Sequence, residues 1–267
     1  ENGERTVTVI NNGVTSLKAK ELLGTNPEVA AKADATSEMY VNNVENAFVE
    51  VHENMYYVDG WFYNDYDDTV RGDVSFGQKA GQGKVKINVG AIDFAKHGVL
   101  AIFSELARGT VNFEPLNYSQ ILLIAAVTEN VKARESGGVL TVTYNLTKDD
   151  FVRFIASQMA GIDYGDLTSE EKEMLDEIMA TIIAQIEKGY EIRKYEIEVK
   201  IAKEGYITRV RVESDVTQTV YDPEDKGDNP AILLVAKSKG VSEINTKINE
   251  KVTIKFPDFS DYVEQTL

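Results

Sequence analysis

The chain has 267 residues, 43% of them hydrophobic and 27% charged, which is an ordinary balance for a folded globular protein. Acidic residues outnumber basic ones by 44 to 28, and the net charge of −16 argues against nucleic acid and anionic membrane surfaces as partners of the whole chain. The absence of cysteine excludes disulfides, thiol catalysis and cysteine metal sites, and no apolar run is long enough to span a membrane.

The N-terminal region predicts a short hairpin. The chain opens with the polar residues 1–5 and no initiator methionine, so we expect a processed start from which a targeting segment has been removed. Residues 6–10 alternate threonine with branched apolar residues, and the Asn-Asn-Gly run at 11–13 carries the signal of a tight turn. Further strands are expected within residues 29–41 and 48–52.

An aromatic hairpin is the clearest local signal of the sequence. Residues 55–63 place apolar and aromatic side chains on both sides of an Asp-Gly pair at 59–60, and this pair favours a type I′ turn. The acidic, glycine-rich passage 64–83 then predicts a long loop, and residues 85–89 predict a short strand.

The middle of the chain mixes helical and strand signals. Apolar residues at helical spacing over 92–106 predict a helix that ends by Gly109, while 119–126 fits either a short helix or a buried strand. Residues 127–133 and 139–146 alternate on the two sides of a Glu-Ser-Gly-Gly turn, which predicts another hairpin.

Two consecutive helices are expected over residues 147–189, and they carry the main apolar surface of the sequence. The first begins at Thr147 with an acid three residues later, which is close to a capping box. The second begins with a full capping box at 168–171 and ends at a Lys-Gly pair. Burying each large apolar side chain is worth roughly 1.5–3 kcal/mol, so this surface must cover another element.

The C-terminal third returns to strand patterns. Residues 195–201 and 206–212 alternate apolar and charged side chains around a Lys-Glu-Gly turn, as in an antiparallel sheet with one face in water. Residues 232–236 and 252–256 complete the predicted strands, and 257–262 form a polar end.

The order of these elements indicates the fold class. Consecutive hairpins with helices inserted between them are typical of an α+β fold in which one antiparallel sheet carries its helices on one face. No repeat or linker divides the chain, so we expect a single domain over 1–267 with a helical hairpin inserted at 147–189.

Known catalytic and metal-binding motifs are missing from the sequence. His52 and His97 stand far apart, no close pair of histidines suits zinc, and no nucleophile elbow occurs. The Gly-Gln-Gly run at 81–83 lacks the third glycine of a dinucleotide loop, and the acidic runs 65–68 and 222–227 lack the ligand spacing of an EF-hand. We therefore predict no catalytic residue, no metal and no cofactor, and expect that the protein is not an enzyme. An enzyme would need carboxylates or histidines that come together only in space.

The candidate binding site is apolar and lies on the two helices. Methionine suits surfaces that accept varied apolar shapes, so the helices could line a lipid-sized cavity over a concave sheet. The same stripe also fits a plain, close-packed core, and both alternatives stay open. The residues expected to bind a hydrophobic ligand are Phe151, Phe154, Ile155, Met159, Met174, Ile178, Met179 and Ile182, with Trp61 and Phe62 of the aromatic hairpin as weaker candidates.

Four stretches together resemble a known family. They are the aromatic hairpin 57–63, the strand Leu-Thr-Val-Thr-Tyr-Asn-Leu at 140–146, the charged hairpin 195–212 and the terminal segment 248–262. The Val-Thr-Ile-Lys-Phe-Pro run in the last of these is the most telling part. Over residues 28–263 the chain resembles secreted lipoproteins of Gram-positive bacteria with a LolA/LppX-like fold, although the shared motifs are soft patterns and not catalytic signatures.

This resemblance implies a fold and a function. The fold is an unclosed antiparallel β half-barrel whose concave face is covered by helices, although the family pattern has a leading helix where residues 6–10 have a strand pattern. The function is non-enzymatic binding of a lipid or another hydrophobic or amphipathic molecule, at the extracellular side of the cell membrane or in a secreted form. Relatives are tethered to the membrane by a lipidated N-terminal cysteine, which is missing from this chain. The alternative is a protein-interaction or sensor module with a solid core and with the aromatic residues 56–63 as its contact surface.

Overall fold

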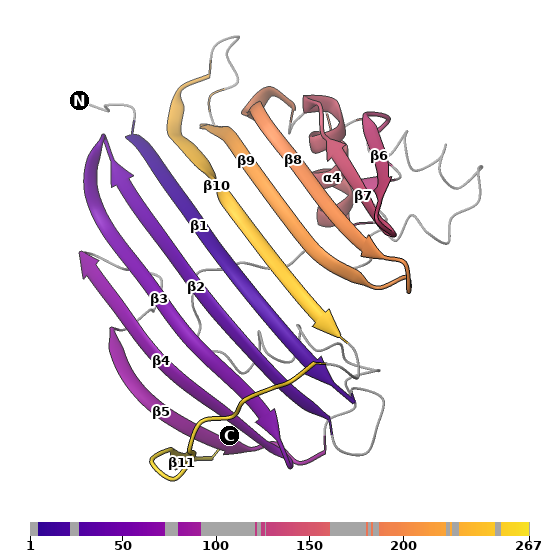
Figure 1. The fold of residues 1–267 in the computed structure, drawn as a ribbon. Helices are drawn as coiled ribbons and strands as arrows, with labels where there is room; N and C mark the ends of the chain where they lie inside the picture. Colours follow the sequence, from indigo (N-terminus) through magenta and orange to yellow (C-terminus); the bar gives the residue numbers. More distant parts are fainter. Residues whose placement is uncertain are drawn as a thin grey trace.

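The computed structural model describes residues 5–21, 27–72, 80–91, 127–160, 187–222, 230–248 and 252–266, together with the single residues 121, 124, 125, 180, 183 and 225. Most of these residues lie in strands (Figure 1). The strands are β1 (Arg5–Lys20), β2 (Glu28–Val41), β3 (Val44–Val58), β4 (Trp61–Gly72), β5 (Gly81–Asn88), β6 (Val131–Ser136), β7 (Val139–Asn145), β8 (Tyr190–Ala202), β9 (Ile207–Tyr221), β10 (Ile232–Ile248) and β11 (Val263–Gln265), and the helix with defined bounds is α4 (Lys148–Ala160).

All these strands form one large open sheet, in the order β11-β5-β4-β3-β2-β1-β10-β9-β8-β7-β6 (Figure 1). The expectation of a single sheet is confirmed, but the prediction that the sheet is antiparallel throughout is wrong. The two ends of the chain meet in parallel, since β1 pairs with β10 at the centre and β11 with β5 at one edge. Pairing between strands so far apart in the chain leaves no local signal in the sequence, whereas the hairpins that fill the rest of the sheet do.

The strand β1 runs through the predicted N-terminal turn, so the expected hairpin at residues 11–13 is wrong. A type I′ turn needs positive φ angles, and neither Asn12 nor Gly13 has one. Instead the Asn12 side chain accepts a hydrogen bond of 3.3 Å from the Val241 N–H on β10. A tight turn is instead formed by the Asn-Asn pair at 42–43, with φ angles of 50° and 64°, between β2 and β3.

The predicted loop over 64–83 is largely strand. β4 continues to Gly72 and β5 begins at Gly81, while residues 73–79 lie outside the described part of the chain. The acidic side chains of Asp65 and Asp67 hid the alternation that places Asn64 on the other face of the same strand. The acidic composition therefore did not distinguish a loop from a strand here, because a strand with one solvated face also carries acidic side chains.

The other predicted turns are confirmed. Positive φ angles mark the Asp-Gly pair at 59–60 (52° and 80°) and the Gly-Gly pair at 137–138 (61° and 78°). The described residues within 119–126 are helical, while the predicted helix 92–106 and most of the second predicted helix lie outside the described residues. Residues 252–256 were expected to form a strand, but they do not. They begin a segment that leads to β5 at the opposite edge of the sheet, where β11 pairs (Figure 1).

The helix α4 starts with the predicted capping box. The Thr147 N–H donates to Asp150 Oδ2 at 2.9 Å, and the Asp150 N–H donates to Thr147 Oγ1 at 3.2 Å. Asp150, which has a shorter side chain than the usual glutamate, thus forms the same two reciprocal hydrogen bonds. They satisfy two N–H groups at the start of the helix.

The two faces of the sheet have different coverings, and we name them accordingly. The helix face carries Ile197, Val199 and Val210, against which α4 packs. The tail face carries Tyr56 and Tyr63, against which the C-terminal segment 252–262 packs. The strand registers connect these two positions across the sheet and show that the faces are opposite ones.

Candidate functional site

The aromatic residues of α4 lie in a close-packed cluster on β8 and β9. The Phe151 and Phe154 side chains are both 5% exposed, and the Phe151 ring centroid lies 4.9 Å from that of Tyr195 and 5.7 Å from that of Tyr190. Ile155 packs against the same cluster. Burial raises the pKa of Tyr195, so its phenol stays protonated. At this end of the helix face the structure therefore has the plain core that was one of the two alternatives.

Phe62 belongs to a different cluster on the helix face. It is fully buried on β4 and packs with Leu17, Val29, Met55 and Tyr57 from β1 to β3. Six strand spacings separate β4 from β8, which corresponds to about 29 Å along the sheet. The structure thus does not bring Phe62 next to the aromatic residues of α4, although all of them lie on the same face.

Trp61 points to the tail face, opposite to Phe62, as successive residues of a strand must. The Lys86 ammonium lies 5.1 Å from the centre of its ring. Trp61 therefore cannot line a site on the helix face. The remaining predicted residues are outside the described side chains: Met159, Met174, Ile178, Met179 and Ile182.

A belt of buried polar side chains crosses the helix face on β3 and β4, and the sequence did not predict it. Glu53 is 1% exposed, Asn64 is fully buried and Asp68 is 8% exposed. Glu53 is the register partner of Tyr66, so Asn64 and Asp68 are its diagonal neighbours on β4. We call Glu53, Asn64, Tyr66 and Asp68 the polar belt. The sequence signal that could have revealed it is the alternation of every second residue along 62–70. It was overlooked because this stretch was predicted to be a loop.

Asn64 is the unusual member of the belt. Neither Nδ2 nor Oδ1 of its carboxamide has a hydrogen-bond partner in the described structure, although both atoms are buried. An unsatisfied buried polar group costs about 1–3 kcal/mol, so such groups are rare in folded proteins and call for an explanation. A ligand that supplies the missing partners is one such explanation.

Apolar side chains flank the polar belt on both sides along the strands. Val51 precedes Glu53 on the helix face and Met55 follows it, each about 7 Å away along the strand. These two residues belong to separate apolar clusters, one around Val49 and one around Phe62. The arrangement is that of a narrow polar strip within an apolar surface.

Gly83 on β5 explains how Tyr66 fits within the belt. A Cβ atom at this position would lie 2.7 Å from the Tyr66 hydroxyl oxygen, which is closer than real Cβ contacts. The glycine therefore leaves room for the ring to lie against β5. The Gly-Gln-Gly run that failed as a nucleotide motif thus has a structural role in positioning the belt.

On the tail face, the aromatic hairpin contacts the chain's own C-terminal segment. The Phe259 ring stacks on Tyr63 with centroids 3.7 Å apart and meets Tyr56 edge-on at 5.7 Å. Lys84 anchors the same segment through a 2.7 Å ion pair with Asp261, and burial raises the pKa of Tyr262. The surface suggested for the alternative interaction module is therefore occupied by these residues.

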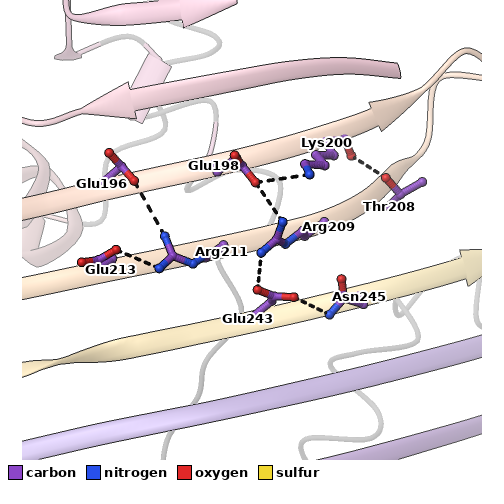
Figure 2. Close-up of polar contacts among 9 residues, drawn as sticks. All are labelled: Glu196, Glu198, Lys200, Thr208, Arg209, Arg211, Glu213, Glu243 and Asn245. Atoms are coloured by element: carbon purple, nitrogen blue, oxygen red, sulfur yellow. Dashed lines mark hydrogen bonds and ion pairs between the residues drawn. The ribbon is translucent and has the colours of Figure 1, made fainter. Parts of the chain in front are cut away.

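A second tail-face feature is an ionic network over β8, β9 and β10 (Figure 2). Arg209 lies between Glu198, at 3.2 Å, and Glu243 on the two neighbouring strands. Arg211 likewise contacts carboxylates at 3.7 and 2.8 Å. Burial acts to raise the pKa of Glu243, but the hydrogen bonds from Arg209 and Asn245 outweigh it and lower that pKa. The charges compensate one another, so the network holds three strands together and offers no free charge for a ligand.

His52 forms a third polar group on the tail face. Its Nδ1 lies 2.9 Å from Asp34, which also pairs with Lys32 at 2.7 Å, and its Nε2 lies 3.5 Å from Glu50. Asp67 is its register partner on β4. The hydrogen bond with Asp34 raises the pKa of His52 against the effect of desolvation. This half-exposed group has the character of a surface ion pair.

The comparisons with known proteins identify no relative. No protein-family model matches the chain, and no curated protein or solved structure is significantly similar to it. Within the described ranges, no helix is long and apolar enough to cross a membrane, and no three His, Asp or Glu side chains are grouped so that they could hold a metal ion.

Proposed function

We propose that this chain is a non-enzymatic binding protein for an amphipathic molecule of the lipid class, which it holds on the helix face of its sheet. The polar group of the ligand lies at the polar belt, and its apolar part lies on the clusters around Phe62 and Val49. The proposal includes the LolA-like half-barrel of the sequence resemblance, with a concave helix face and the helices of 147–189 as its cover. It also includes tethering at the extracellular side of the membrane through a lipidated N-terminus.

The observation that carries this proposal is the unpartnered carboxamide of Asn64. In a packed core a leucine, which has the same branched arrangement of heavy atoms, would avoid the desolvation cost, and the chain has leucine or valine at many equivalent positions. The asparagine keeps one donor group and one acceptor at the centre of an apolar face. Those groups are useful only when something that enters the site pairs with them.

The composition of the belt indicates the kind of polar group. Two carboxylates lie on the same face as the carboxamide: Glu53 is its diagonal neighbour on β3, and Asp68 lies beyond Tyr66 on β4. Carboxylates accept hydrogen bonds and disfavour a neighbouring anion in a site of low polarity. We therefore expect a headgroup that donates hydrogen bonds, such as a hydroxylated or ammonium group, and not a bare phosphate or a free fatty acid. Apolar clusters on both sides of the belt suit the hydrocarbon part.

The test is lipid capture by purified protein. Delipidated protein is incubated with a cell-envelope lipid extract, separated by gel filtration, and its bound lipid is identified by mass spectrometry. We expect a hydroxylated or amine-bearing lipid at close to one equivalent, and its loss in Asn64→Leu. The matched control is Asn54→Leu, which makes the same change on the tail face of the neighbouring strand.

Three results would overturn the proposal. One is protein that returns from the incubation with no lipid. Another is lipid retained equally by the wild type and by Asn64→Leu, because the ligand would then not contact the belt. The third is loss of lipid in both variants, since a change on the tail face should leave the helix face intact.

A further inference from the structure

A groove on the tail face lies where β1, β9 and β10 meet the start of the C-terminal segment. Its volume is about 570 Å³, which falls in the range of roughly 300–1,000 Å³ found for small-molecule sites. It is lined by Lys18 of β1, by Asn245, Thr246 and Lys247 of β10, by Tyr206 and Thr208 at the start of β9, and by Val252 and Thr253. Because it lies on the opposite face from the polar belt, it is independent of the ligand site proposed above.

Two lysines give this groove an uncompensated positive charge. Lys18 and Lys247 are register partners in the parallel β1–β10 ladder, and both are exposed. Like charges directly opposite each other destabilise a sheet, and neither lysine forms an ion pair with any residue that the structure describes. Their neighbours differ in this respect, since Lys20 pairs with Glu28 at 3.5 Å and Lys200 with Glu198 at 3.7 Å. In a chain with a net charge of −16, these two lysines place a local positive charge between β1 and β10.

The other polar residues of the groove are positioned by the ionic network beside it (Figure 2). Asn245 Nδ2 donates to Glu243 at 2.8 Å, and the Thr208 hydroxyl donates to the Lys200 carbonyl at 3.2 Å. These bonds hold both side chains at the rim of the groove. Tyr206 adds a further hydroxyl, and no carboxylate is found among the residues that line the groove in the described structure.

We propose that this groove binds a phosphate-type anion, either free or as the headgroup of an anionic phospholipid. A lysine ammonium is a compact point charge that suits phosphate, and two of them side by side match a dianion. An anion between Lys18 and Lys247 also relieves their mutual repulsion. The Tyr206 hydroxyl and the second N–H of the Asn245 carboxamide can donate hydrogen bonds to the remaining oxygens. The volume exceeds that of a phosphate ion, so the groove has room for the rest of a phosphorylated molecule.

The experiment compares two double variants of the full chain. Lys18→Gln with Lys247→Gln removes both charges from the groove. Lys237→Gln with Lys239→Gln removes two exposed lysines from the tail face of the same strand β10, outside the groove, so it changes the net charge by the same amount. Far-UV circular dichroism and urea unfolding confirm that each variant is folded. Binding of inorganic phosphate is measured by calorimetry, and binding of vesicles by cosedimentation, with phosphatidylglycerol against phosphatidylcholine.

The expected result is phosphate binding that weakens by about tenfold or more in the groove variant, remains within about twofold in the control and falls as salt is raised. If phosphatidylglycerol vesicles bind with the same dependence on Lys18 and Lys247, the anion is a lipid headgroup; if only phosphate does, the site takes a free anion. The proposal is wrong if neither probe binds, or if the two double variants weaken binding equally, because bulk charge would then be the cause.

Discussion

Replacing Asn64 by leucine should make the ligand-free protein more stable. Leucine has the same branched arrangement of side-chain heavy atoms as asparagine, although it is larger, and it removes two buried polar atoms that have no partner in the described structure. Relief of this desolvation is worth about 1–3 kcal/mol, if the new side chain packs without strain. For a chain of this length, each kcal/mol corresponds to a shift of about 2–4 °C in the melting temperature, so the rise should be about 2–12 °C.

The assay is urea unfolding of delipidated protein, followed by circular dichroism, for the wild type, Asn64→Leu and the tail-face control Asn54→Leu. The control should remain within about 0.5 kcal/mol of the wild type, as is usual for substitutions outside the core. If Asn64→Leu proves less stable than the wild type by about 1 kcal/mol or more, the carboxamide has a partner in the ligand-free protein and our argument fails.

Addition of the ligand should reverse the order of stability. At a ligand concentration of 100 times its dissociation constant, the wild type gains about 2.7 kcal/mol, because only the folded state binds. Asn64→Leu should gain little or nothing. A variant that is more stable when empty and less stable when the ligand is present would separate a binding role of Asn64 from a structural one.

Three further predictions concern stability alone. Because the folded-state pKa of His52 is raised, the protonated imidazole stabilises the folded protein below the unfolded pKa of about 6.5. This stabilisation is lost as the pH rises through the folded-state pKa. His52→Gln should therefore abolish this part of the pH dependence of the urea midpoint. Gly240→Ala should cost at least about 3 kcal/mol or prevent folding, since a Cβ there would overlap the Asn11 carbonyl on β1, and a change below 1 kcal/mol would contradict that close approach. Phe259→Ala should cost about 1–3 kcal/mol through its stacking on Tyr63, and a double-mutant cycle that shows no coupling between the two rings would refute it.

The hairpins show how far local sequence could predict this fold. The turns at 59–60 and 137–138 were predicted because a two-residue connection with positive φ angles needs Gly, Asn or Asp, and few other segments carry that signal. The same rule failed at residues 11–13, where an identical signal lies inside β1. There the pairing of β1 with β10 and β2 on its two sides outweighs the local preference for a turn.

The candidate site was predicted less well than the strands. The helical spacing around Phe151 and Phe154 predicted an apolar surface that covers a sheet, and both side chains are buried. That spacing cannot report which distant strands meet, so it did not separate the cluster on β8 and β9 from the cluster on β1 to β4. Hydrophobic spacing also did not predict the polar belt, because Glu and Asn are usually exposed and Glu53 and Asn64 are buried here.

The sequence by itself determined the local structure: the main hairpins, the capping box of α4, the alternation of wet and buried residues, and the acidic surface. These depend on backbone turns and on hydrophobic periodicity within a few residues. The tertiary structure alone decided that β1 and β10 meet in parallel at the centre of one mixed sheet. That pairing places Lys18 beside Lys247, while the register of β3 and β4 places the buried Asn64 diagonal to the buried Glu53. Both candidate sites arise from contacts between separate strands, whose register the chain fixes only when the whole sheet assembles.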